Sequence, residues 1–209
     1  GQMHRYPDAS CYELIKKLSL KWSVPPEYLA LGNGSNEIID VLIRTFCEPG
    51  DKILTSEAAF ICYPLCAQAA RIGVTKVALR QDYTMDMKKM AEKVSSEHRI
   101  VFIPNPNNPT GTYVNKNDIE DFLRKFGDSD DLLICFDEAY TEFVRAGDYE
   151  PALNYAKKYK NVAVVRTMSK IYGLAALRVG IMLAHPDITK YFHKVRNPFN
   201  VNSLAQVAA

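Results

Sequence analysis

The segment Arg166-Thr-Met-Ser-Lys-Ile-Tyr-Gly-Leu-Ala-Ala-Leu-Arg178 connects two short apolar runs, and the rest of the chain can be interpreted outward from it. The runs at 161–166 and 179–184 have the β-branched composition of buried strands. Ser169 and Lys170 are therefore predicted to follow the carboxyl end of a strand. Ligands of α/β sheets bind at that edge, so this lysine is the first residue of a candidate site.

Similar runs alternate with longer helical patterns along the chain, which is typical of strands joined by crossover helices. Strands are predicted at 28–31, 52–55, 74–79, 99–103, 132–136, 161–166 and 179–184. Helices are predicted at 10–22, 35–46, 60–71, 87–96, 116–126, 151–159 and 187–195. No repeat or linker interrupts them. The sequence therefore predicts an α/β fold, a three-layer α/β/α sandwich with a mostly parallel seven-stranded sheet.

Composition argues against several classes of function. The chain has 209 residues, of which 47% are hydrophobic and 24% charged, enough to bury a substantial core. Its 26 basic and 24 acidic residues leave a net charge of +2, so neither nucleic-acid binding nor a basic membrane patch is indicated. No apolar run could span a bilayer and no charged-then-apolar leader opens the chain, so we expect a cytoplasmic protein.

The cysteines indicate free thiols rather than disulfides or a metal centre. There are five, an odd number, and most lie in apolar segments. Cys62 and Cys66 would share one face of a helix. Zinc, however, needs about four ligands, and no histidine or second cysteine pair lies at a suitable spacing. We therefore predict no metal.

A second candidate element, Gly32-Asn-Gly-Ser-Asn-Glu37, links a predicted strand to a predicted helix. Such a turn directs backbone N–H groups and the positive end of the helix dipole at an anion. The alternative is a plain glycine turn in which Ser35 caps the helix. A dinucleotide fingerprint is disfavoured because Glu37 replaces its third glycine. Ser169 and Arg178 favour the anion site, since a hydroxyl and a guanidinium can bind one phosphate.

Two further segments follow predicted strands. Asp137-Glu-Ala-Tyr140 places Asp137 at a buried strand end, where a carboxylate is costly unless a cation such as a protonated pyridine pairs with it. The alternative is that Asp137 only caps a turn. Asn107-Asn-Pro-Thr-Gly111 has turn composition and would offer the Asn108 amide to the same cleft, although alone it would be a simple loop. Phe60 could cover an aromatic ring or belong to the core.

Together these segments resemble the fold-type I pyridoxal-phosphate (PLP) dependent aminotransferases, and most closely their histidinol-phosphate aminotransferase subfamily. The Asn-Pro-Thr-Gly and Ser-Lys elements are general to the superfamily, whereas the Arg-Tyr-Pro-Asp and Asn-Val-Asn-Ser elements are more particular. The matching phrases span almost the whole chain: His4-Arg-Tyr-Pro-Asp8, Leu31-Gly-Asn-Gly-Ser-Asn-Glu37, Phe46-Cys-Glu-Pro-Gly-Asp51, Asn107-Asn-Pro-Thr-Gly111, Phe136-Asp-Glu-Ala-Tyr140, Arg166-Thr-Met-Ser-Lys170 and Lys194-Val-Arg-Asn-Pro-Phe-Asn-Val-Asn-Ser-Leu-Ala-Gln206.

The resemblance implies catalytic roles. Lys170 would carry PLP as a Schiff base and move the proton between the substrate Cα and the cofactor C4′ carbon. Asp137 would keep the pyridine nitrogen protonated, which makes the ring an electron sink. Tyr140 and Asn108 would hydrogen-bond the ring 3′ oxygen, and Phe60 would stack on the ring.

The resemblance also implies a phosphate site and a homodimer. Tyr6 would reach the phosphate from the partner subunit, and Thr167 would support the turn at Ser169. The other phosphate ligands would be the backbone N–H groups of Ser35 and Asn36, the Ser169 hydroxyl and Arg178.

Relatives in this family add a small domain built from both chain ends. By that resemblance, residues 1–27 are an N-terminal segment and helix, residues 28–209 are the PLP-binding large domain, and the C-terminal small domain is absent. The arginine that binds the substrate carboxylate would belong to the absent part.

The implied activity is transfer of an amino group from L-histidinol phosphate to 2-oxoglutarate in histidine biosynthesis, giving imidazole acetol phosphate and L-glutamate. One alternative is another PLP enzyme of this fold, such as an aromatic aminotransferase or a threonine-phosphate decarboxylase. A second is a cofactor-binding fragment without turnover. A nicotinamide-binding protein is the weakest, because Glu37 breaks the glycine fingerprint.

Overall fold

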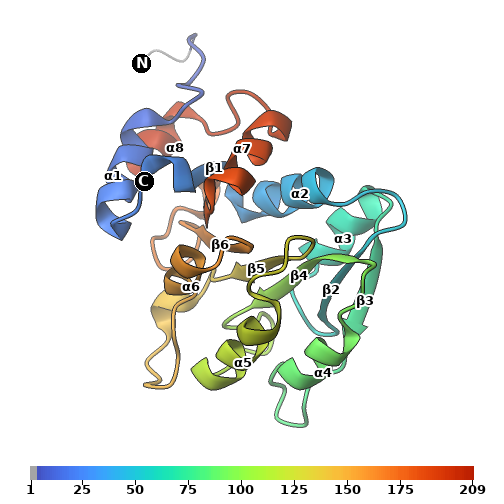
Figure 1. Ribbon diagram of the computed structural model, residues 1–209. Helices are drawn as coiled ribbons and strands as arrows, with labels where there is room; N and C mark the ends of the chain where they lie inside the picture. The colour runs from blue at the N-terminus through green and yellow to red at the C-terminus, as the bar shows by residue number, and fades with distance from the viewer. Residues whose placement is uncertain (1–3) are drawn as a thin grey trace.

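The structure is a computed structural model that describes residues 4–209 (Figure 1). In this part of the chain seven strands form one sheet, in the order β1-β7-β6-β5-β4-β2-β3. There β7 runs opposite to the other six strands, so the predicted mostly parallel sheet is confirmed. The strands are β1 Leu29–Asn33, β2 Lys52–Ser56, β3 Gly73–Val77, β4 His98–Pro104, β5 Leu133–Asp137, β6 Val162–Thr167 and β7 Val179–Ala184.

The reversal of β7 follows from the short connection before it. Residues 168–178 contain a single 3-10 turn, Ala175–Leu177, and no α-helix. A parallel neighbour needs a crossover of a dozen or more residues, whereas an antiparallel one does not. As a result, the carboxyl ends of β1, β2, β4, β5 and β6 and the start of β7 all lie at one edge of the sheet.

Helices cover both faces of the sheet, which confirms the three-layer sandwich (Figure 1). One apolar core joins α2, α3 and α7 to the sheet through residues such as Ile39, Tyr63 and Phe192. The other joins α1, α4, α5, α6 and α8 to the opposite face, and includes Leu18 and Phe122. The helices are α1 Tyr12–Trp22, α2 Gly34–Phe46, α3 Cys62–Ala69, α4 Met87–Lys93, α5 Lys116–Phe126, α6 Leu153–Lys158, α7 Pro186–Val195 and α8 Ser203–Ala208.

Some helices are shorter than predicted. Helix α3 begins at Cys62 rather than at Phe60, because Phe60 lies in the preceding turn and its carbonyl accepts the Tyr63 N–H at 3.3 Å. Helix α4 stops at Lys93, because Val94 is extended and the Ser95 N–H bonds Nδ1 of the buried His98 at 3.1 Å. Local hydrogen bonds of this kind compete with the helical ones.

The five cysteines are free, and the Sγ atoms of Cys62 and Cys66 lie 3.5 Å apart. Among residues 4–209, no three potential metal-binding side chains gather at one place. Over the same residues, none of the helices has the length and apolar character needed to cross a membrane.

Candidate functional site

A cavity of about 220 Å³ lies at the edge where the parallel strands end. It brings together every residue assigned to the site from the sequence except Tyr6. Those residues are Ser35, Asn36, Phe60, Asn108, Asp137, Tyr140, Thr167, Ser169, Lys170 and Arg178. Five connections that are far apart in the sequence therefore supply one site.

Lys170 stands three residues beyond β6. Its Nζ lies over the ring of Tyr140, 5.2 Å from the ring centroid. The turn before it is held by Thr167, whose Oγ1 accepts the Ser169 N–H at 3.1 Å and donates to Ser169 Oγ at 2.9 Å. The two hydroxyls and the lysine amine thus line the same cavity.

Asp137 is the last residue of β5 and only 5% exposed, as predicted for a buried strand end. The Tyr63 hydroxyl donates to its Oδ2 at 2.8 Å, and the Ala139 N–H donates to its Oδ1 at 3.1 Å. Burial raises the pKa of Asp137, while these hydrogen bonds and the charge of Lys170 act in the opposite direction. Within residues 4–209 no cationic group lies in ion-pair distance of Asp137.

The two neighbouring asparagines of the 107–111 loop have different roles. Asn107 is buried, and its Nδ2 donates to the Ala58 carbonyl at 2.9 Å and to Thr110 Oγ1 at 2.8 Å, so it holds the loop in place. Asn108 lines the cavity. Phe60 lines it too and packs edge-on against Tyr63, with ring centroids 5.9 Å apart.

The amino end of α2 forms the anion-binding corner. Asn33, not Ser35, is the residue before the first turn, and no side chain caps it, so the alternative of a Ser35 cap is wrong. Gly34 has a φ of 77° and donates its N–H to the Arg178 carbonyl at 3.1 Å. A Cβ at Gly34 would lie 2.2 Å from Nη2 of Arg178. Only glycine therefore lets the Arg178 guanidinium lie against the first turn of α2.

Glu37 stabilises the anion-binding corner through hydrogen bonds. Its Oε2 accepts the Asn33 N–H at 2.6 Å and the Asn200 Nδ2 at 2.7 Å. A carboxylate in the first helical turn also interacts favourably with the helix dipole. Glu37 therefore has a structural role at the position where a dinucleotide fingerprint has its third glycine.

Tyr6 lies outside the cavity. Its side chain is 81% exposed and stacks on Phe199, with ring centroids 4.7 Å apart. Its role in the site of a partner subunit remains a prediction.

Four residues of the cavity wall were not predicted from the sequence: Tyr63, Pro104, Pro106 and Ala139. The signal for Tyr63 was present, because it lies three residues after Phe60 and would share its side of the helix. The backbone N–H of Ala139 carries no signal in the sequence.

A buried ion pair between Glu138 and Arg166 lies next to the site. Glu138 follows Asp137 and is 1% exposed, and its Oε2 accepts from Nε and Nη2 of Arg166 at 2.9 and 2.7 Å. The Arg166 guanidinium also lies over the Trp22 ring, 5.3 Å from its centroid. The pair therefore ties the end of α1 to the strand ends that carry the site.

Replacing Arg166 by Met is expected to lower the free energy of unfolding by about 3–5 kcal/mol, because it leaves the Glu138 carboxylate buried and unpaired. Urea denaturation followed by circular dichroism measures this. Arg124→Met is the control: its pair with Asp121, at 2.9 Å, is largely exposed, and its loss should cost no more than about 1 kcal/mol. Equal losses for both variants would contradict a stabilising role for the buried pair.

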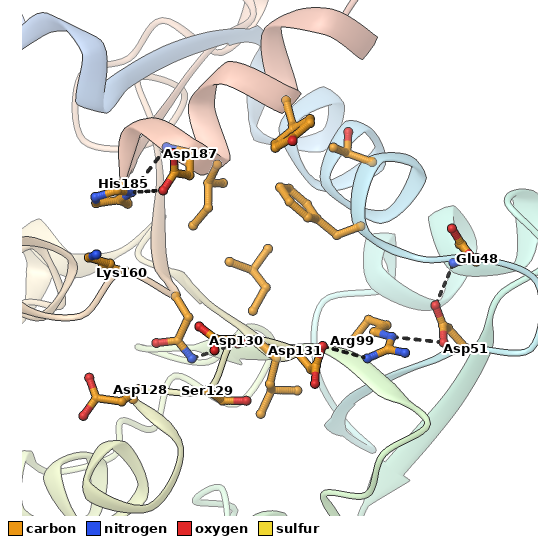
Figure 2. Close-up of a pocket in the computed structure, with 18 of the residues that line it drawn as sticks. Glu48, Asp51, Arg99, Asp128, Ser129, Asp130, Asp131, Lys160, His185 and Asp187 are labelled. Carbon is orange, nitrogen blue, oxygen red and sulfur yellow. Dashed lines mark hydrogen bonds and ion pairs between the residues drawn. The ribbon is translucent and has the colours of Figure 1, made fainter.

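A larger cavity, about 780 Å³, lies at the opposite edge of the sheet (Figure 2). It contains none of the predicted site residues. Charged groups in it neutralise one another, since Arg99 contacts Asp51 at 3.2 Å and Asp131 at 3.7 Å. The smaller cavity is therefore the better candidate, because it combines an amine, an unpaired buried carboxylate and an anion-binding corner.

The chain is similar to known proteins along its whole length. The family described as aminotransferase class I and II matches residues 1–209. A histidinol-phosphate aminotransferase of Bdellovibrio bacteriovorus is 51% identical over 210 residues, which cover 99% of this chain and 56% of the relative. The chain thus spans little more than half the length of the curated relatives that it resembles.

Solved structures share the fold. One is the histidinol-phosphate aminotransferase of Sinorhizobium meliloti, solved in complex with pyridoxal-5'-phosphate. It superimposes with a TM-score of 0.92 at 25% sequence identity, and the match covers 100% of this chain and 56% of the S. meliloti chain. The L-threonine-O-3-phosphate decarboxylase of Porphyromonas gingivalis superimposes with a TM-score of 0.83 at 23% sequence identity. The match covers 99% of this chain and 62% of the decarboxylase chain. At that identity the second likeness shows the fold alone.

Proposed function

Because the chain belongs to the aminotransferase class I and II family, we propose that it forms the PLP site of an aminotransferase whose amino donor is L-histidinol phosphate. The observation that carries this proposal is the position of Asp137 in the same cavity as Lys170 and Arg178. Its buried carboxylate lacks a cationic partner among the described residues and would find one in a protonated pyridine nitrogen. Bound PLP supplies an electron sink for the electrons released at the substrate Cα.

The residues present fit the phosphate end of this cofactor. Arg178 contributes a guanidinium, Ser169 a hydroxyl, and the first turn of α2 contributes the N–H groups of Ser35 and Asn36. A helix amino end and an arginine together suit a phosphate dianion. Thr167 would act indirectly, by fixing the Ser169 hydroxyl.

The remaining residues would act on the ring and the reacting atoms. Phe60 would cover one face of the ring, while Asn108 and Tyr140 would donate to its 3′ oxygen. Lys170 would bind the cofactor through its Nζ and afterwards hold the proton that moves at the substrate Cα. The ring of Tyr140 under Nζ would keep that amine directed into the cavity.

The names of the relatives support histidinol phosphate as the amino donor. We propose 2-oxoglutarate as the acceptor and a place in histidine biosynthesis. We further propose a cytoplasmic homodimer in which Tyr6 completes the phosphate site of the partner. The exposure of Tyr6 leaves its hydroxyl accessible to a second subunit.

The test is a comparison of half-reactions. The PLP-loaded chain is mixed with histidinol phosphate, phenylalanine or threonine phosphate, and the cofactor absorbance band is followed. Conversion to the amine form by histidinol phosphate alone is the expected result. Preference for phenylalanine, or release of carbon dioxide from threonine phosphate, would contradict it in favour of the other PLP enzymes. Binding of PLP without conversion by any donor would indicate a cofactor-binding fragment.

Gly34→Ala is expected to weaken PLP binding at least ten-fold, because the new methyl group displaces the Arg178 guanidinium, a charge-assisted bond worth about 1.5–3 kcal/mol. Titration of the apo chain with PLP measures this. Gly50→Ala is the control for backbone strain, since Gly50 also has a positive φ, 103°, but a Cβ there meets no atom within 4 Å. An unchanged affinity for Gly34→Ala would exclude Arg178 as a phosphate ligand.

A further inference from the structure

We infer that Tyr63 is a positioning residue for the cofactor: its hydroxyl orients the Asp137 carboxylate toward the ring nitrogen of PLP. The inference rests on the proposed function, because it takes the PLP ring to lie beside Asp137. It assigns a role to a residue of α3 that the family motifs quoted above do not include.

The position of the Tyr63 hydroxyl is rigidly determined. Tyr63 is fully buried, and its ring stacks on Phe102 with centroids 4.6 Å apart and an interplanar angle of 9°. Phe60 packs edge-on against the same ring. Close packing of this kind leaves one side-chain conformation, and in it the hydroxyl lies 2.8 Å from Asp137 Oδ2.

The hydrogen bonds leave Asp137 free to accept from a ligand. A carboxylate has about four acceptor positions on its two oxygens. Tyr63 occupies one on Oδ2 and the Ala139 N–H occupies one on Oδ1. Two donors on different oxygens prevent rotation of the carboxylate, while its remaining lone pairs are available to a ring N–H.

Tyr63 also favours the charged form of Asp137. Burial has the largest effect and raises the pKa of Asp137. Among the interactions that lower this pKa, the hydrogen bond from Tyr63 has the largest effect. Burial raises the pKa of Tyr63 well above its usual value, so the phenol stays protonated and remains a donor. The other titratable groups that interact with Asp137 are Glu138, Lys170, Cys62 and Cys135.

Tyr63→Phe tests the inference, because it removes the hydroxyl and keeps the ring between Phe102 and Phe60. We expect a PLP affinity lower by roughly ten- to one-hundred-fold, the range for a hydrogen bond to a charged group. Asp137 is then protonated more easily, so the loss of PLP affinity on acidification should begin at a higher pH than in the unsubstituted chain. Titrations of the apo chain with PLP at a series of pH values measure both effects.

The control is Tyr113→Phe, which removes a bond of the same type: the Tyr113 hydroxyl donates to Asp148 Oδ1 at 2.7 Å, but at the surface. Its PLP affinity should not change. Tyr63→Phe is also combined with Asp137→Asn. If Tyr63 acts through the carboxylate, most of its effect on affinity disappears when Asp137→Asn is already present.

Two results would overturn the inference. One is a Tyr63→Phe chain with lower thermal stability but unchanged PLP affinity and pH dependence, which would make the bond purely structural. The other is an undiminished effect of Tyr63→Phe in the chain that carries Asp137→Asn, which would mean direct contact with the cofactor. If the unsubstituted chain bound no PLP, the proposed function would fail, and this inference with it.

Discussion

Lys170→Ala is expected to abolish the covalent, borohydride-reducible link between the chain and PLP and to lower amino transfer by at least roughly 10²–10⁴-fold. Lys170 is the only lysine among the described residues that line the candidate cavity. No other amine in that wall can therefore take over either the link or the proton transfer. Mass spectrometry after borohydride reduction measures the link directly, even if the chain does not turn over.

Lys160→Ala provides the matched control. Lys160 lines the larger cavity at the other edge of the sheet, where none of the site residues lies (Figure 2). This variant should retain the reducible link and its absorbance band. A Lys170→Ala chain that still became labelled by PLP and borohydride at the same stoichiometry would refute the assignment of Lys170.

The sequence predicted the sheet and the edge that carries the site because both depend on local patterns. Apolar β-branched runs mark buried strands, and the segments after those runs hold the polar residues. Once the strands are parallel, their carboxyl ends meet. The convergence of Asn108, Asp137 and Lys170 could therefore be predicted without knowing any long-range contact.

The parts that could not be predicted depend on contacts between distant segments. Tyr63 and Asp137 are 74 residues apart, and only the packing of α3 on β4 brings the hydroxyl to the carboxylate. The fit of Gly34 against Arg178 likewise depends on the antiparallel position of β7 beside β1. A glycine-rich turn alone does not reveal which side chain will occupy the space that it leaves.

Asp137→Asn is expected to keep PLP in the cavity but to lower the rate of amino transfer by about 10²–10³-fold or more, as for loss of one preorganised electrostatic contact. The phosphate ligands and Lys170 are unchanged, so PLP at saturating concentration still binds, although more weakly because the ring nitrogen has lost its charged partner. The neutral amide, however, cannot pair with a protonated ring nitrogen. Single-turnover rates with histidinol phosphate measure the loss, and near-normal turnover would contradict the electron-sink role.

The pH dependence separates this effect from a general disturbance. Burial raises the pKa of Asp137, so its charge is present above that pKa and is lost as the pH falls through it. The unsubstituted chain should therefore lose activity on acidification in a step that belongs to Asp137, and the Asp137→Asn chain should lack that step. Asp148→Asn, at the surface beside Tyr113, should retain both the rate and the step. An acid step of unchanged position in Asp137→Asn would assign that titration to another group, and Asp137 would not be the partner of the ring nitrogen.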